Sequence, residues 1–177
     1  MTSLTRALHE SLLRPLGSLV IAHSDLGRKP LLLDLRLPWP PRLRLYMYSL
    51  VDGAGSQRPT EYKAVLRVPG QKPGDYGSFD HSGGRIALLV GYRADLDVFV
   101  LWDASLHPEF KNGGNIQVKH ETVHNAAGSG RAEQSRTLAS GSIEIVIACQ
   151  SPELINAIDD RVAWTGGVSR EWAASRS

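Results

Sequence analysis

The sequence has little cysteine and no long apolar run. Its single cysteine, Cys149, excludes a disulfide framework and a four-cysteine zinc site. Because no histidine lies near Cys149 in the sequence, we interpret it as a small buried hydrophobic side chain rather than a nucleophile. No segment approaches the roughly 18 consecutive apolar residues of a membrane span, and His9 and Glu10 stand where a signal peptide has its apolar centre. We therefore expect a cytoplasmic protein with no membrane partner.

An excess of charge of one sign is also lacking. Twenty Lys and Arg residues face eighteen Asp and Glu residues, which gives a net charge of +2. This near balance permits an anionic partner without requiring one, so any basic surface must come from the local placement of cations. The chain also lacks a Walker loop, a nucleotide-binding glycine fingerprint and a His-Asn-His (HNH) nuclease motif. We expect no cofactor and no nuclease centre in this chain.

Apolar patterning predicts an α+β fold, with a twisted, mainly antiparallel sheet, peripheral helices and a single domain. The clearest hairpin joins residues 86–92 to residues 97–102, and their nearly continuous apolar runs predict central strands covered on both faces. Further strands are expected at 31–37, 42–49, 63–68, 116–118 and 142–149.

Helices are expected at the N-terminus, at 120–127 with an end at Gly128, and after Ser151 as the capping residue with Pro152 in the first turn. Residues 129–140 are rich in Arg, Ser and Gly, which favours a polar loop. We assign residues 1–161 to one binding domain and residues 162–177 to a C-terminal tail, either a docking helix or a linker.

Two short motifs suggest metal chemistry. His120-Glu121-Thr122-Val123-His124 matches the zinc-protease signature, in which two histidines bind zinc and the glutamate is the general base. A helix of about two turns is short for such a site, and Ala127 stands where the longer zinc-protease pattern has glycine. A zinc-dependent hydrolase built on His120, Glu121 and His124 is therefore the alternative reading, and we expect no bound metal.

The second motif is Glu61-x-Lys63 with Asp52 upstream, which resembles the core of metal-dependent nucleases. Such a core needs its carboxylates together on neighbouring strands. Three-residue matches are common, and Pro59 disturbs the strand that the motif requires. We expect no nuclease activity from these residues.

Three loops place cations and amide donors beside glycine or proline. Arginine suits guanine edges, and lysine, asparagine and backbone N–H groups suit phosphates. Glycine lets a backbone approach a duplex closely. The candidate nucleic-acid-binding residues are Gln57, Arg58 and Pro59 in the first loop, His107, Pro108, Lys111 and Asn112 in the second, and Ser129, Gly130 and Arg131 in the third.

The order of these segments resembles the sulfur-binding domains of McrA-like restriction endonucleases. The resemblance covers roughly residues 55–150 and rests on Arg58-Pro59 with Glu61-Tyr62-Lys63, on 88–92, on 97–104 and on His107-Pro108. It implies a module that binds double-stranded DNA carrying phosphorothioate linkages. It also implies an HNH nuclease on another domain or a partner chain, so that this chain is a binding domain and not an enzyme.

The same resemblance implies roles for individual residues. Pro108 and the ring of His107 would form the wall of an apolar cavity for the sulfur, and the stem of Lys111 would close it. Gln57 or Arg58 would lie beside the cavity, and Arg131 would read the flanking bases. This chain has His107 and Lys111 where family members carry a tyrosine and a small apolar residue.

Overall fold

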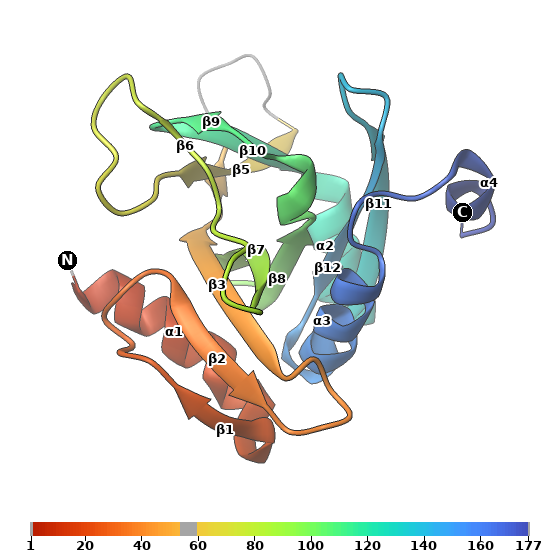
Figure 1. Cartoon of the computed structure of the whole chain (residues 1–177). Helices are drawn as coiled ribbons and strands as arrows, with labels where there is room; N and C mark the ends of the chain where they lie inside the picture. The colour runs from red at the N-terminus through yellow and green to blue at the C-terminus, as the bar shows by residue number, and fades with distance from the viewer. Residues whose placement is uncertain (1, 54–59, 177) are drawn as a thin grey trace.

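A seven-stranded sheet forms the centre of the molecule (Figure 1). The computed structural model describes residues 2–53 and 60–176. The strand order is β1-β2-β3-β7-β8-β12-β11. The strands are β1 Val20–His23, β2 Leu31–Leu35, β3 Arg42–Ser49, β7 Ile86–Arg93, β8 Val98–Trp102, β11 Arg131–Thr137 and β12 Ile143–Cys149.

Two smaller sheets and four helices surround it. A three-stranded sheet, here called the small sheet, has the order β10-β5-β4, and β6 pairs with β9. Their strands are β4 Val51–Asp52, β5 Glu61–Leu66, β6 Tyr76–Gly77, β9 Phe110–Lys111 and β10 Gly114–Lys119. The helices are α1 Thr2–Leu16, α2 His120–Ser129, α3 Leu154–Ala163 and α4 Arg170–Ala174, with short 3₁₀ turns at Gly17–Leu19, Ala104–Leu106 and Ser151–Glu153.

The strand pairing confirms the predicted α+β fold with a mainly antiparallel sheet. The predicted hairpin is formed by β7 and β8, in which Leu89 pairs with Trp102 and Arg93 pairs with Val98. In the described part of the chain, β3 and β7 are the parallel exception. Parallel neighbours need a long crossover connection, and here that connection supplies β4, β5 and β6. Two of the three strands of the small sheet, β4 and β5, thus belong to the crossover between two central strands.

Both faces of the large sheet are covered. Helices α1, α3 and α4 pack on one face, and the small sheet and α2 pack on the other. Every residue of β12 is therefore buried, which explains the uninterrupted apolar runs in the sequence. Cys149 lies inside this core, and burial raises the pKa of its thiol to about 12. The interpretation of Cys149 as a buried hydrophobic residue is confirmed.

Three local expectations were wrong. Residues 131–137 are not a loop but the edge strand β11, which pairs with β12 over its whole length. Its polar sequence hides the strand, because an edge strand can face water on one side. Helix α2 continues through Gly128 to Ser129, and Gly130 caps it with a φ of 96° that suits a helix terminus. The Ser151 hydroxyl donates to Asp97 instead of capping a helix.

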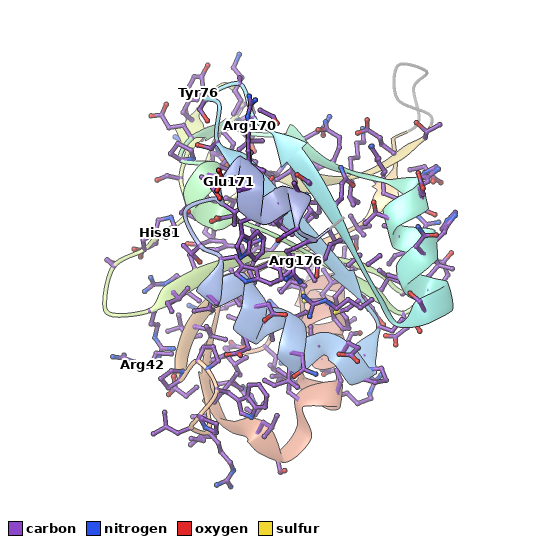
Figure 2. The ribbon with its side chains drawn as sticks, turned by 90° about the vertical axis from the view of Figure 1, so that its right-hand side faces the viewer. Arg42, Tyr76, His81, Arg170, Glu171 and Arg176 are labelled. Carbon is purple, nitrogen blue, oxygen red and sulfur yellow. The ribbon has the colours of Figure 1, made fainter. Side chains whose placement is uncertain are left out.

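The C-terminal tail docks on the body. Val168 bridges to Ile143, and Ala173 of α4 is buried in the core. Trp164 and Trp172 meet edge to face, and the Arg176 guanidinium lies over both rings. Figure 2 shows Arg176 over the body, whereas Arg42 and His81 project from its edge. Within the described residues, no helix is long and apolar enough to cross a membrane.

Candidate functional site

The His107 ring is turned toward the protein interior. Its Nε2 lies 2.9 Å from Oε2 of Glu144, a fully buried carboxylate on β12. The same oxygen accepts the backbone N–H of Asp103, and Arg136 Nε lies 3.4 Å from the other carboxylate oxygen. Pro108, the next residue, is exposed. The structure therefore anchors His107 internally and presents the ring of Pro108 at the surface.

The turn between β9 and β10 places Lys111 and Asn112 beside Arg67. The N–H of Asn112 donates to the carbonyl of Asp75, and the N–H of Gly113 donates to the carbonyl of Leu66. Gly113 has a φ of 82°, and a β-carbon there would lie 3.7 Å from Nη2 of Arg67. Lys111 and Arg67 are both exposed. Lys111 follows Pro108 by three positions, which limits the distance between their α-carbons to about 10 Å.

Arg131 lies elsewhere. It pairs with Cys149 at one end of β12, whereas His107 contacts Glu144 five residues earlier on that strand. Five residues of strand span about 17 Å. The Arg131 guanidinium is 2.7 Å from Asp160 and 3.0 Å from Glu133. The structure thus does not bring Arg131 together with Pro108, and it commits the guanidinium to two carboxylates.

Ser129 and Gly130 terminate α2. The Ser129 hydroxyl donates to the carbonyls of Asn125 and Arg131, which satisfies acceptors at the helix end. Gly130 donates its N–H to Ala126. Both residues are therefore beside Arg131 rather than beside Pro108. Gln57, Arg58 and Pro59 lie outside the described residues.

The outer face of the small sheet carries cations that sequence analysis did not group together. Tyr62, Ala64 and Leu66 of β5 point into the core, so Lys63 lies on the opposite, outer face. Lys119 on β10 pairs with Glu61 and shares this face. Arg67 follows β5 at the far end of this sheet, and Lys111 is on β9, just before the turn that leads into β10. Together they form what we call the cationic face: Lys63, Arg67, Lys111 and Lys119.

Glu61, which pairs with Lys119, is an acidic residue on this face. Among residues 2–53 and 60–176, none of the four cations has a carboxylate oxygen within 4 Å. The strand β10 separates Lys119 from the turn at Lys111 by about 17 Å, half of a helical turn of B-DNA. The alternation of polar and apolar residues along β5 and β10 was the sequence signal for this face. One sequence does not show, however, that these two strands pair.

The zinc-protease signature lies on α2 as expected. The rings of His120 and His124 are 5.7 Å apart, and the Tyr62 hydroxyl is 2.8 Å from Nε2 of His124. His120 Nε2 is 3.7 Å from Asp52, and Glu121 is exposed. The described residues contain no group of three His, Cys, Asp or Glu side chains that could hold a metal. The two histidines instead pack around Tyr62.

The candidate nuclease core is divided between two faces of the small sheet. Asp52 pairs with Tyr62, and directly opposed residues of an antiparallel pair share a face. Glu61 and Lys63 flank Tyr62 on β5 and therefore lie on the other face. The carboxylates of Asp52 and Glu61 are not placed to share one metal ion.

One comparison with known proteins finds a match. Residues 41–158 match the model of the family described as MTaX1, methylase-associated X1. The matched region runs from β3 into α3 and contains the whole cationic face. No curated protein and no solved structure matches the chain. An association with methylases places such a domain in a restriction–modification context. Since the match covers about two thirds of the 177 residues, the chain belongs to the methylase-associated X1 family.

Proposed function

We propose that this chain is the DNA-recognition module of a modification-dependent restriction system and that it binds duplexes carrying phosphorothioate linkages. In this proposal the chain has no catalytic centre of its own. An HNH nuclease, on another domain or a partner chain, cleaves the DNA. The family membership supports the restriction context, and the cationic face supports an anionic partner.

The cationic face is the observation on which the proposal rests. Duplex DNA presents one negative charge per roughly 1.7 Å of its axis, and cations that contact it release condensed counterions. Lys63 and Lys119 are on the outer face of two paired strands, Arg67 follows one of these strands, and Lys111 precedes the turn into the other. Asn115 on the same face adds an exposed amide that suits a phosphate or a base edge.

Pro108 is the proposed contact for sulfur. Sulfur in place of a phosphate oxygen keeps the charge but is larger and more weakly hydrated. An apolar surface penalises a hydrated oxygen more than a sulfur, because the oxygen loses hydrogen bonds to water there. A proline ring offers an apolar wall without an N–H group. The bond from His107 to buried Glu144 fixes the chain just before this ring.

Removal of charge from the cationic face should weaken binding to modified and unmodified duplexes alike. Arg67→Ala and Lys111→Ala should each reduce the slope of log affinity against log salt by about one, since each removes one phosphate contact. Fluorescence anisotropy titrations at several salt concentrations measure this slope. Arg170→Ala is the matched control, because Arg170 is an exposed cation on α4, which packs on the opposite face of the large sheet. Equal effects from all three variants would contradict the assigned face.

Pro108→Ala should change the ratio of the affinities for the phosphorothioate and the phosphate duplex, and it should leave the contacts of the cationic face intact. We expect weaker binding to the phosphorothioate duplex with little change for the matched phosphate duplex, a loss of roughly tenfold in the ratio, or about 1.4 kcal/mol. The two titrations are made at one salt concentration. An unchanged ratio in a folded Pro108→Ala protein would place the sulfur elsewhere, while loss of binding in Arg67→Ala would still support DNA recognition.

A further inference from the structure

A pocket of about 260 Å³ lies between α1, the end of β3 and the outer face of the small sheet. Its lining combines two cations with an aromatic ring and aliphatic side chains. The lining residues are Leu4, Thr5, Leu8, Lys29, Tyr48, Ser49, Val51, Val65 and Arg67. Among the described residues that line it, none carries a carboxylate. This composition is typical of a site for an anion that carries an apolar body.

Lys29 is the central cation of the pocket. It precedes β2, and its ammonium lies 3.8 Å from the centroid of the Tyr48 ring. Burial, with a smaller contribution from the charge of Arg67, lowers the pKa of Lys29 to about 8. Over the described ranges 2–53 and 60–176, neither Lys29 nor Arg67 has a carboxylate oxygen within 4 Å. A half-buried lysine beside a second cation costs the fold stability, and an anionic ligand bound there would offset this cost.

The surroundings of Lys29 add donors and positive potential. The first turn of α1, which contributes Leu4 and Thr5 to the lining, contains no acidic residue. A helix N-terminus carries a partial positive charge. The Tyr48 hydroxyl donates to the carbonyl of Arg67 at 2.7 Å and so holds the Arg67 backbone against the pocket. These features surround the same pocket as Lys29 and Arg67.

The aliphatic walls indicate what accompanies the anion. Leu4 and Leu8 come from α1, and Val51 and Val65 come from β4 and β5. Since Val51 pairs with Lys63 and Val65 is two residues further along β5, both valines are on the same outer face as Lys63. A volume at the small end of ligand sites suits a group of about mononucleotide size.

We propose that this pocket binds a phosphate monoester with an apolar body, with Lys29 and Arg67 holding the phosphate and Tyr48, Leu8 and Val65 contacting the remainder. The phosphate comes either from a free mononucleotide or from the 5′ end of a nucleic-acid strand. The site is separate from Pro108, and its binding of small anions does not depend on recognition of a phosphorothioate duplex.

Calorimetric titration of the full chain with inorganic phosphate, adenosine 5′-monophosphate and adenosine tests the site. We expect the monophosphate to bind more tightly than inorganic phosphate, and adenosine not to bind. A short single strand with a 5′-phosphate, compared with the same strand ending in a hydroxyl, distinguishes the two sources. Binding of the phosphorylated strand alone assigns the site to strand ends. The proposal is overturned if inorganic phosphate, the monophosphate and the phosphorylated strand all fail to bind at about 10 mM. This limit corresponds to a binding free energy weaker than about −3 kcal/mol.

Lys29→Met and Arg67→Met should each reduce monophosphate affinity at least tenfold. Lys29→Met should also raise Tm below pH 8, because it removes a charge that burial disfavours. Loss of binding in a more stable protein separates a ligand-binding role from a structural one. Lys72→Met is the control, since Lys72 is an exposed lysine outside the lining. Unchanged affinity in both pocket variants would overturn the assignment.

The affinity should fall as the pH rises through about 8, where Lys29 loses its proton. Two described groups near Lys29 stay neutral over this range, because burial raises the pKa of Tyr48 and lowers that of His9. The phosphate monoester has its second pKa near 6 and keeps its charge above pH 7. Affinity that is flat from pH 7 to pH 9 in the native chain would show that Lys29 does not hold the anion.

Discussion

Replacement of Arg161 by leucine should lower the free energy of unfolding by about 3–5 kcal/mol, the cost of removing one partner from a buried ion pair. Arg161 is 1% exposed on α3, and its Nη2 lies 3.6 Å from Oδ2 of the equally buried Asp103. The guanidinium also donates to the carbonyl of Ile145 on β12 and, at 3.0 Å, to that of Trp164. Leucine would leave a buried carboxylate and buried carbonyls without this donor.

In the Arg161→Leu variant, Asp103 would keep some of its hydrogen bonds. Its carboxylate accepts the N–H of Gly166 at 2.7 Å and the N–H and hydroxyl of Ser105. These bonds hold the turn that leads to His107 and dock the C-terminal tail, so the loss of Arg161 should also loosen that tail. Hydrogen exchange of the Gly166 amide reports on this loosening independently of global unfolding.

Urea denaturation followed by circular dichroism measures the effect on stability. Arg170→Leu provides the control, because it removes an exposed arginine without a carboxylate within 4 Å among the described residues and should change stability by less than about 0.5 kcal/mol. A cost below about 1 kcal/mol for Arg161→Leu would mean that water replaces the guanidinium in this network.

The fold was readable from the sequence where apolar patterning was strong. The segments that form β7, β8 and β12 are buried on both faces, so their residues are mostly apolar and the strands can be recognised in the sequence. The strand β11 was not predicted, because it is an edge strand with solvent on one side and its residues are mostly polar. The parallel pairing of β3 with β7 was equally hidden, since it joins segments that β4, β5 and β6 separate along the chain.

The candidate site was only partly readable, because it depends on pairings between distant segments. Lys111 and Asn112 lie at an exposed turn, as their glycine-rich sequence predicted. Nothing in the sequence near Arg131 shows that Asp160, nearly thirty positions later, provides its carboxylate partner. Likewise, Lys29 and Arg67 line one pocket because the fold brings both to Tyr48, whose ring lies under the Lys29 ammonium and whose hydroxyl donates to the Arg67 carbonyl. Charge near a glycine identifies a loop, but the fold decides which charges remain available to a ligand.

Trp102→Ala should cost about 3–5 kcal/mol of stability, and it should affect the small sheet most. Trp102 is fully buried at the end of β8, and its ring packs on Gly91, where an added β-carbon would lie 3.0 Å from Cη2. Its Nε1 donates at 3.0 Å to the carbonyl of Gln117 in β10. One side chain therefore joins the large sheet to the strand that carries Lys119, and alanine would leave both a cavity and a missing bond.

Trp102→Phe separates these two contributions. Phenylalanine keeps most of the apolar contact but has no N–H, and the Gln117 carbonyl still accepts Arg136 Nη1 at 2.8 Å. The Phe variant should therefore cost only about 1–2 kcal/mol. Because the cationic face needs the small sheet in place, Trp102→Ala should lose DNA affinity at temperatures where circular dichroism still shows a folded protein, and Trp102→Phe should retain it. Equal DNA affinity in the folded Ala variant would show that the small sheet is held by its other core contacts, or that DNA binds elsewhere.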